Sequence, residues 1–432
     1  MLLVYTPEIT NRIKFIFRLI FGEILGTEVN FVTNKEQFKQ YTGAKINYSA
    51  ARIDSNELHF QSSTLLFETG IKEQHIHVFD WEGSKAFFFT DKTSTFPFDP
   101  FAASFYLVSR YEEYLPSLLD KHNRYDAHSS LAYRHGFLQK PIINNWAYKI
   151  KATIEKKFPA FSFPEKKYEF IPTLDIDMAY SYKGKGWFRN SGALAKSLLK
   201  FNIKQAKERL KVLFNLLEDP YDNYNFQFEI HKKYQLQPIY FFLLADYGNC
   251  DKGLPPKSKK LHSLIKSIAN KATIGIHPSY SSNTNEEKLN REINLLSFIT
   301  HQKITKSRQH FLKLTLPLTY QNLITKGIEE DYTMGYAAET GFRASICTPF
   351  YFYDLEKDEE TTLKIYPFEV MEGTLKDYMK IKPENAITHI KSIIEEIKKV
   401  NGTFISLWHN DNLQENGPWK NVYEEMLTIT VL

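Results

Sequence analysis

The stretch Ile171-Pro-Thr-Leu-Asp-Ile-Asp-Met178 is a short apolar run that ends in two carboxylates separated by one residue. Side chains alternate between the two faces of a β-strand, so Asp175 and Asp177 are predicted to point to the same side. At that spacing they could share a metal ion or a proton. The alternative role for such a pair is to cap the loop that follows the strand.

Downstream of this stretch, strand-like runs alternate with helical patterns. This alternation predicts parallel strands covered by outer helices, in a barrel or an open sheet. A long, basic, helical segment at 183–235 is interpreted as an insertion after the first strand. Strands are expected over 170–176, 238–244, 273–276, 305–312, 365–370 and 403–408, and helices over 191–217, 258–270, 286–300, 318–326 and 384–399.

The first 165 residues predict a smaller, mixed α/β domain. A helix is expected over 8–24, strands near 44–48, 57–60 and 86–90, and a further helix from residue 98, with Asp99 as its cap and Pro100 in its first turn. Three prolines and a charge cluster between 158 and 172 exclude a continuous helix there. The predicted division is therefore an N-terminal domain over 1–165 and a second domain over 166–432.

Composition and charge narrow the class of protein. The 432 residues carry a net charge of only +5, with no arginine-rich arm, which argues against nucleic-acid binding. Two cysteines, Cys250 and Cys347, are too few for a disulfide framework and are interpreted as small, buried hydrophobic residues. No signal peptide and no run of about 20 uncharged apolar residues is present, so the prediction is a cytoplasmic protein without a membrane span.

Three further polar clusters follow predicted strands. They are Ile274-Gly-Ile-His277, Ser307-Arg-Gln-His310 and the final strand that delivers His409, with Asn410 and Asp411 beside it. Because the carboxyl ends of parallel strands meet at one edge, these clusters are expected to converge with the aspartate pair. Taken singly, each of these histidines could instead have only a structural role, with hydrogen bonds to the backbone of a turn.

Candidate substrate contacts come from rings and charges near these clusters. The side chains of Tyr280 and Trp408 stand next to the histidine motifs and offer rings for the face of a sugar. Asp331 and Arg343 lie in a segment dense in Gly, Tyr and charge and could bind sugar hydroxyls or a carboxylate. A buried structural Asp–Arg pair is the equal alternative.

The order of these motifs resembles the polysaccharide-deacetylase, or NodB-homology, family. Thr173-Leu-Asp-Ile-Asp177 resembles the family's Thr-Phe-Asp-Asp-Gly strand, with a spacer between the aspartates and no glycine after them. Gly275-Ile-His277, Arg308 and Leu407-Trp-His409 resemble the later motifs. The resemblance, nearest to a divergent bacterial subgroup with an extra N-terminal α/β domain, implies an α/β fold with a distorted (β/α) barrel over 166–432.

The resemblance also implies a site and a reaction. A divalent metal, zinc by expectation, would be held by Asp177 and His277. Ser281 stands where the family's second histidine is expected, so His310 is the candidate replacement, unless it only packs near the pocket. Asp175 would act as general base, Arg308 would orient it, and His409 would act as general acid.

The implied reaction is removal of an acetyl group from an N- or O-acetylated carbohydrate. Two alternatives stay open at this stage. One is a catalytically silent carbohydrate-binding or scaffold protein on the same fold, and the other is a metal-dependent hydrolase of a non-sugar amide.

Overall fold

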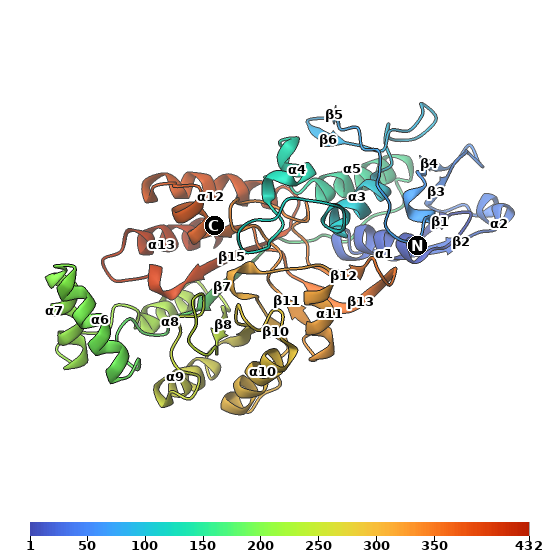
Figure 1. The fold of residues 1–432 in the computed structure, drawn as a ribbon. Coiled ribbons are helices and arrows are strands. Elements are labelled where there is room, and N and C mark those ends of the chain that lie inside the picture. Colours follow the sequence, from blue (N-terminus) through green and yellow to red (C-terminus); the bar gives the residue numbers. More distant parts are fainter. Residues whose placement is uncertain (432) are drawn as a thin grey trace.

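The structure is a computed structural model that describes residues 1–431 (Figure 1). A small parallel sheet near the N-terminus has the order β2-β1-β3-β4. Its strands are β1 (Leu2–Tyr5), β2 (Val29–Val32), β3 (Lys45–Ser49) and β4 (Leu58–Gln61). The strands predicted near 44–48 and 57–60 are therefore confirmed. The strand predicted over 86–90 is reduced to the short hairpin β5 (Phe79–Trp81) and β6 (Ser84–Ala86).

Helices around this sheet begin where capping residues predict. The Asp99 side chain accepts hydrogen bonds from two backbone amides at the start of α3 (Pro100–Val108). The predicted helix 8–24 is α1 (Asn11–Phe17), capped by Thr10, and a π-helical continuation over Arg18–Ile24. The other helices of this part are α2 (Lys35–Gln40), α4 (Leu131–Arg134) and α5 (Ile142–Lys157).

A nine-stranded sheet forms the centre of the rest of the chain, in the order β12-β13-β11-β10-β9-β8-β7-β15-β14. All neighbours are parallel except β12 and β13, as the alternation of strands and helices predicts. The strands are β7 (Glu169–Ile176), β8 (Ile239–Leu243), β9 (Thr273–His277), β10 (Lys306–Ser307), β11 (Glu330–Asp331), β12 (Phe350–Asp354), β13 (Glu359–Ile365), β14 (Val370–Met371) and β15 (Thr403–His409).

The helices of this part lie on the outside of the sheet (Figure 1). They are α8 (Tyr224–Lys233), α9 (Lys259–Ala269), α10 (Glu286–Thr300), α11 (Leu318–Thr325), α12 (Pro383–Lys398) and α13 (Pro418–Val431). No helix within residues 1–431 combines the length and the apolar character needed to cross a bilayer.

The closed barrel expected from the resemblance is not confirmed, because no strand ladder within residues 1–431 joins β14 to β12. The segment between β13 and β14 nevertheless forms hydrogen bonds both with the chain that follows β11 and with β15. The Phe368 amide donates to the Met334 carbonyl (3.0 Å), beyond β11, and the Glu369 amide donates to the Ile405 carbonyl (3.2 Å) of β15. Single hydrogen bonds therefore link the two sides where a ladder would close a ring.

Three predicted elements are shorter or broken. The strand expected over 305–312 ends at Ser307, because the chain turns at Phe311 and Leu312, which both have positive φ. The helix expected over 191–217 is two helices, α6 (Trp187–Leu199) and α7 (Ile203–Leu213), separated by Phe201 at φ 55°. The strand expected over 365–370 is divided between the end of β13 and β14.

The two parts of the chain share one hydrophobic core. The rings of Phe15 and Phe105 pack against Tyr353, with centroids 4.9 and 5.1 Å away. The buried Arg12 pairs with Asp358 at 2.8 Å. The boundary predicted at residue 165 falls between α5 and β7 and stays a prediction, because these contacts cross it.

Candidate metal centre

The carboxyl ends of three parallel strands bring the predicted polar clusters together. Asp175 lies opposite His409 in the β7–β15 register, and His277 ends the next strand but one, β9. Gly275 is required in β9, because a Cβ there would lie 2.8 Å from the Lys306 carbonyl and still closer to the Phe241 ring. The absence of a side chain lets β9 approach its neighbours and positions His277.

Asp177, His277 and His310 form a compact cluster of metal-ligand type. The Nε2 atom of His277 lies 3.2 Å from Oδ1 of Asp177, and Nε2 of His310 lies 3.2 Å from Oδ2. One ligand atom from each residue lies within 4.8 Å of the others. The three side chains proposed as ligands from the sequence therefore meet at one point.

Hydrogen bonds fix the orientation of both imidazoles. The Nδ1 atom of His277 bonds to the Arg308 carbonyl, and Nδ1 of His310 bonds to Asp251 at 2.8 Å. With Nδ1 bonded in this way, each ring directs its Nε2 towards Asp177, where it could bind a shared cation, an arrangement typical of histidines that bind metals. Asp251 was missed in the sequence, where only its place after a buried strand, 59 residues from His310, could have pointed to it.

The donor set fits a divalent cation. Oδ1 of Asp177 is buried and has no hydrogen-bond partner among the residues described, which is costly unless a cation is nearby. Burial raises the pKa of Asp177, but the three histidines around it outweigh that effect and hold its pKa well below the usual range. Burial lowers the pKa of His310, and Asp177 and Asp251 reverse this and raise it to about 9. The carboxylates therefore favour a positive charge between them.

Arg308 holds Asp175 in place. Its Nη1 atom donates to Oδ1 of Asp175 at 2.9 Å and to the Thr173 hydroxyl at 2.7 Å, and its Nε donates to the Tyr332 carbonyl. Both charged side chains are buried. Oδ2 of Asp175 faces the cluster, 3.6 Å from Nε2 of His277.

His409 lies beside the cluster, with its Nε2 3.8 Å from Oδ2 of Asp177. Its Nδ1 and its backbone amide both bond to Oε1 of Glu372, each at 2.8 Å. Burial lowers the pKa of His409, but Glu372 and the aspartates raise it well above the usual value. Glu372 was also missed in the sequence, although it follows the predicted strand 365–370 as the other acids follow theirs.

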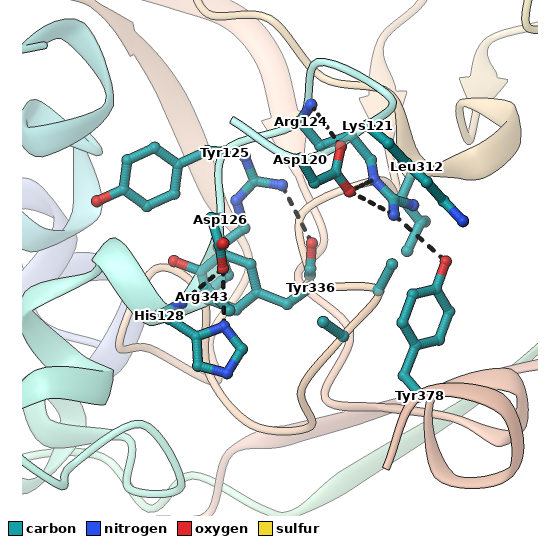
Figure 2. A pocket seen from close by; sticks show the side chains of 14 residues that line it. Asp120, Lys121, Arg124, Tyr125, Asp126, His128, Leu312, Tyr336, Arg343 and Tyr378 are labelled. Atoms are coloured by element: carbon teal, nitrogen blue, oxygen red, sulfur yellow. Dashed lines mark hydrogen bonds and ion pairs between the residues drawn. The ribbon is translucent and has the colours of Figure 1, made fainter. Parts of the chain in front are cut away.

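A cavity of about 270 Å³ opens over the cluster. Its apolar wall includes Leu312, Met371 and Leu407, and its polar rim includes Asp377 and Asn412. An adjoining cavity of about 310 Å³ is lined largely by the N-terminal segment 120–128 (Figure 2).

Arg124 lies on both cavities. It donates to the Phe311 carbonyl at 2.7 Å and to the Tyr378 hydroxyl at 3.3 Å, and it pairs with Asp120 (Figure 2). The N-terminal part of the chain therefore contributes to the walls of the site.

Two residues predicted as substrate contacts, Trp408 and Asp331, line neither cavity. Trp408 is fully buried and packs on Tyr423, because neighbours on a strand face opposite sides and His409 faces the cavity. Asp331 is fully buried and accepts hydrogen bonds from Ser307 and Thr333.

Arg343, also predicted as a substrate contact, is buried and donates to Glu113 and the Gly335 carbonyl, but it lines the adjoining cavity, so this role stays a prediction. Asp331 and Arg343 do not form the ion pair that was the structural alternative for these two residues. Tyr280 is half-buried and contacts Phe311, which lines the cavity. Ser281 lies apart from the cluster, near Ser279 and Lys288.

Comparison with known proteins gives a family match only for the N-terminal part. Residues 2–159 match a family of unknown function, DUF7033. No protein with a curated description matches the chain.

Solved structures with detectable similarity include a protein assigned as a polysaccharide deacetylase from Mycobacterium smegmatis, at 12% identity over 63% of this chain and 86% of that chain, with a TM-score of 0.41. A polysaccharide deacetylase from Bacillus cereus has 11% identity over 61% of this chain and 86% of that chain, with a TM-score of 0.29. A CE4 family pseudoenzyme from Bacillus anthracis has 11% identity over 61% of this chain, with a TM-score of 0.28, and the chain spans 60% of its length. Similarity at this level concerns the fold alone, so function is argued below from the geometry of the site.

Proposed function

We propose that the protein is a metal-dependent hydrolase that removes acetyl groups from an N- or O-acetylated carbohydrate. The observation that carries this proposal is the meeting of Asp177, His277 and His310 in a cavity that Asp175 and His409 also line. An acid, a base and a metal-ligand cluster around one cavity are the groups that acyl hydrolysis needs.

Asp177, His277 and His310 would hold the divalent cation, for which nitrogen and oxygen ligands with an open position favour zinc. When bound, such an ion lowers the pKa of a water molecule towards about 7 and polarises the acetyl carbonyl. Asp177, His277 and His310 together offer three ligands without a histidine at 281, which supports an enzyme over the catalytically silent alternative.

Asp175 is assigned the role of general base. Arg308 occupies its Oδ1, which leaves Oδ2 directed at the cluster and able to accept a proton from the attacking water. Arg308 is thus a positioning residue. His409, kept protonated by Glu372, would donate from Nε2 to the leaving amine or alkoxide.

The cavity suits an acetylated sugar. Leu312, Met371 and Leu407 offer an apolar wall to the methyl of the acetyl group, and Arg124 and Asn412 offer donors to hydroxyls. The adjoining cavity has room for a neighbouring unit of a longer glycan. A non-sugar amide would use the first cavity and not the second.

A panel of N- and O-acetylated mono- and oligosaccharides, with simple acetamides beside them, tests the proposal. We expect zinc-loaded protein to release acetate from saccharides, and Asp175→Asn and His409→Gln to lower kcat by ~10²–10⁴-fold with metal content unchanged. Arg124→Ala should raise KM more than it lowers kcat. Wild-type turnover by Asp175→Asn would refute the mechanism, and turnover of acetamides alone would refute the substrate class.

A further inference from the structure

A helical hairpin leaves the sheet directly after β7 and ends before α8. Its helices α6 and α7 project at the end of the molecule opposite the N-terminal sheet (Figure 1, green). It is attached at its base, where Arg189 donates to the Lys252 and Gly253 carbonyls and Asn190 donates to the Tyr182 carbonyl. The rest of the hairpin therefore extends from an anchored base.

The inner face of this hairpin is polar. Arg209 donates to Asn190 at 3.1 Å, and Ser197 donates to Gln205 at 3.0 Å. The side chains of Arg209, Asn190 and Ser197 are buried. A helical pair in a soluble protein normally buries its apolar side chains between the helices. Here Ala206 and Val212 are buried beside these hydrogen-bonded groups, and most of the larger apolar side chains are left outside.

The outer surface carries most of the exposed apolar side chains of the protein. Trp187 is 81% exposed, Phe188 91% and Phe201 87%. Of the 21 large hydrophobic side chains exposed in the described part of the chain, eleven lie between residues 187 and 217: Trp187, Phe188, Leu198, Leu199, Phe201, Ile203, Leu210, Leu213, Phe214, Leu216 and Leu217. Such a concentration marks a surface that is covered by something else.

The same segment is strongly basic. Residues 183–217 contain nine lysines and arginines against one acidic residue, Glu208, a net charge of +8. The whole chain carries +5, so the other residues together carry −3. The basic charge of the protein is thus concentrated on the hairpin.

We propose that the hairpin 183–217 is a peripheral membrane-binding element that inserts its apolar side chains into the surface of an anionic bilayer. Amphipathic helices with Trp, Phe and Leu on one face and Lys and Arg beside it lie in this way at the headgroup level. Helix α6 has 13 residues, about 20 Å at 1.5 Å per residue, too short to span a hydrocarbon core of about 30 Å.

The charge distinguishes this occupant from two others. If a second copy of the protein docked hairpin to hairpin, two segments with a net charge of +8 each would face and repel one another. A nucleic acid would use the lysines and arginines but would leave the leucines and phenylalanines uncovered. An anionic lipid surface matches both features, since it offers negative headgroups above an apolar layer. The inference does not depend on the proposed hydrolase activity.

Sedimentation of the full-length protein with lipid vesicles tests the proposal. We expect binding to vesicles of phosphatidylcholine and phosphatidylglycerol at a ratio of about 7:3, and at least tenfold weaker binding to phosphatidylcholine alone or at high salt. Trp187→Ser with Phe188→Ser should lower the partition coefficient by about 100-fold or more, because two large side chains lose their burial. Phe298→Ser with Leu318→Ser, at exposed positions elsewhere, is the matched control and should bind as wild type.

Tryptophan fluorescence gives a second readout. Trp187 is the exposed tryptophan, while Trp146, Trp408 and Trp419 are buried and Trp81 is half-buried. A blue shift on addition of anionic vesicles that disappears in Trp187→Phe, while sedimentation persists, would support the proposal.

Failure of the wild-type protein to bind anionic vesicles would overturn the proposal. The proposal would also be overturned if the wild-type protein formed a concentration-dependent dimer and the Trp187→Ser, Phe188→Ser variant did not. The hairpin surface would then be an interface with a second copy. Binding of an RNA oligonucleotide without binding of vesicles would overturn the proposal in the same way. Unchanged circular dichroism shows that each variant is folded.

Discussion

Replacement of His310 by alanine is expected to lower the affinity for zinc by ~10²–10³-fold. Structural zinc sites with four protein ligands bind with about 10–16 kcal/mol, which is about 2.5–4 kcal/mol for each ligand. A tenfold change in affinity corresponds to about 1.4 kcal/mol. His310 is one of the three proposed ligands, with Nε2 3.2 Å from the Asp177 carboxylate, so its loss would remove about one such share.

Two further variants make the test specific. Asp251→Asn keeps the ligand but removes the negative charge that orients its imidazole at 2.8 Å, and losses of about 10–100-fold are typical for such outer partners. His262→Ala removes a histidine on α9 that bonds to the Pro256 carbonyl and should leave the affinity unchanged.

The assay is competition for zinc between the metal-free protein and a chromophoric chelator of known affinity near neutral pH. Wild-type affinity in His310→Ala would refute the assigned ligand set. An equal loss in His262→Ala would show that the effect is general destabilisation.

Three other predictions follow from buried charges. Glu372→Gln removes the carboxylate that raises the pKa of His409, so the loss of activity at high pH should begin at a lower pH, measured as kcat against pH; an unmoved limb would contradict this role. Glu113→Gln leaves two buried arginines without that counter-charge and should lower the free energy of unfolding by about 3 kcal/mol in urea titrations, and an unchanged midpoint would contradict the ion-pair network. The third concerns His231, whose pKa burial lowers to about 4 against about 6.5 in the unfolded chain. Below pH 6.5 the unfolded state therefore binds the extra proton and stability falls, by about 2 kcal/mol between pH 7 and pH 5, and His231→Phe should lack this difference.

Much of the fold and half of the site could be predicted from local sequence. The strands at 170–176 and 273–276 and the helices at 258–270 and 286–300 have periodicities that neighbouring residues determine by themselves. The two-residue spacing of Asp175 and Asp177 places both carboxylates on one face of the chain, and the structure has them there. Strict use of the same alternation would also have excluded Trp408, the neighbour of His409.

The remaining site residues depend on contacts between distant parts of the chain. His310 reaches Asp177 from a turn and not from the expected strand, because the backbone changes direction at Phe311. Asp251 and Glu372 face their histidines across 59 and 37 residues, and no local pattern encodes such a pairing. The contribution of Arg124 from the N-terminal part was likewise not predictable.

Local sequence is enough to predict most strands and helices and the face of a strand that a side chain occupies, because these depend on the geometry of adjacent residues. Which charges meet depends on how the whole chain packs. A buried carboxylate or imidazole is stable only beside a partner, and that partner is supplied by whichever segment the packing of the whole chain brings there.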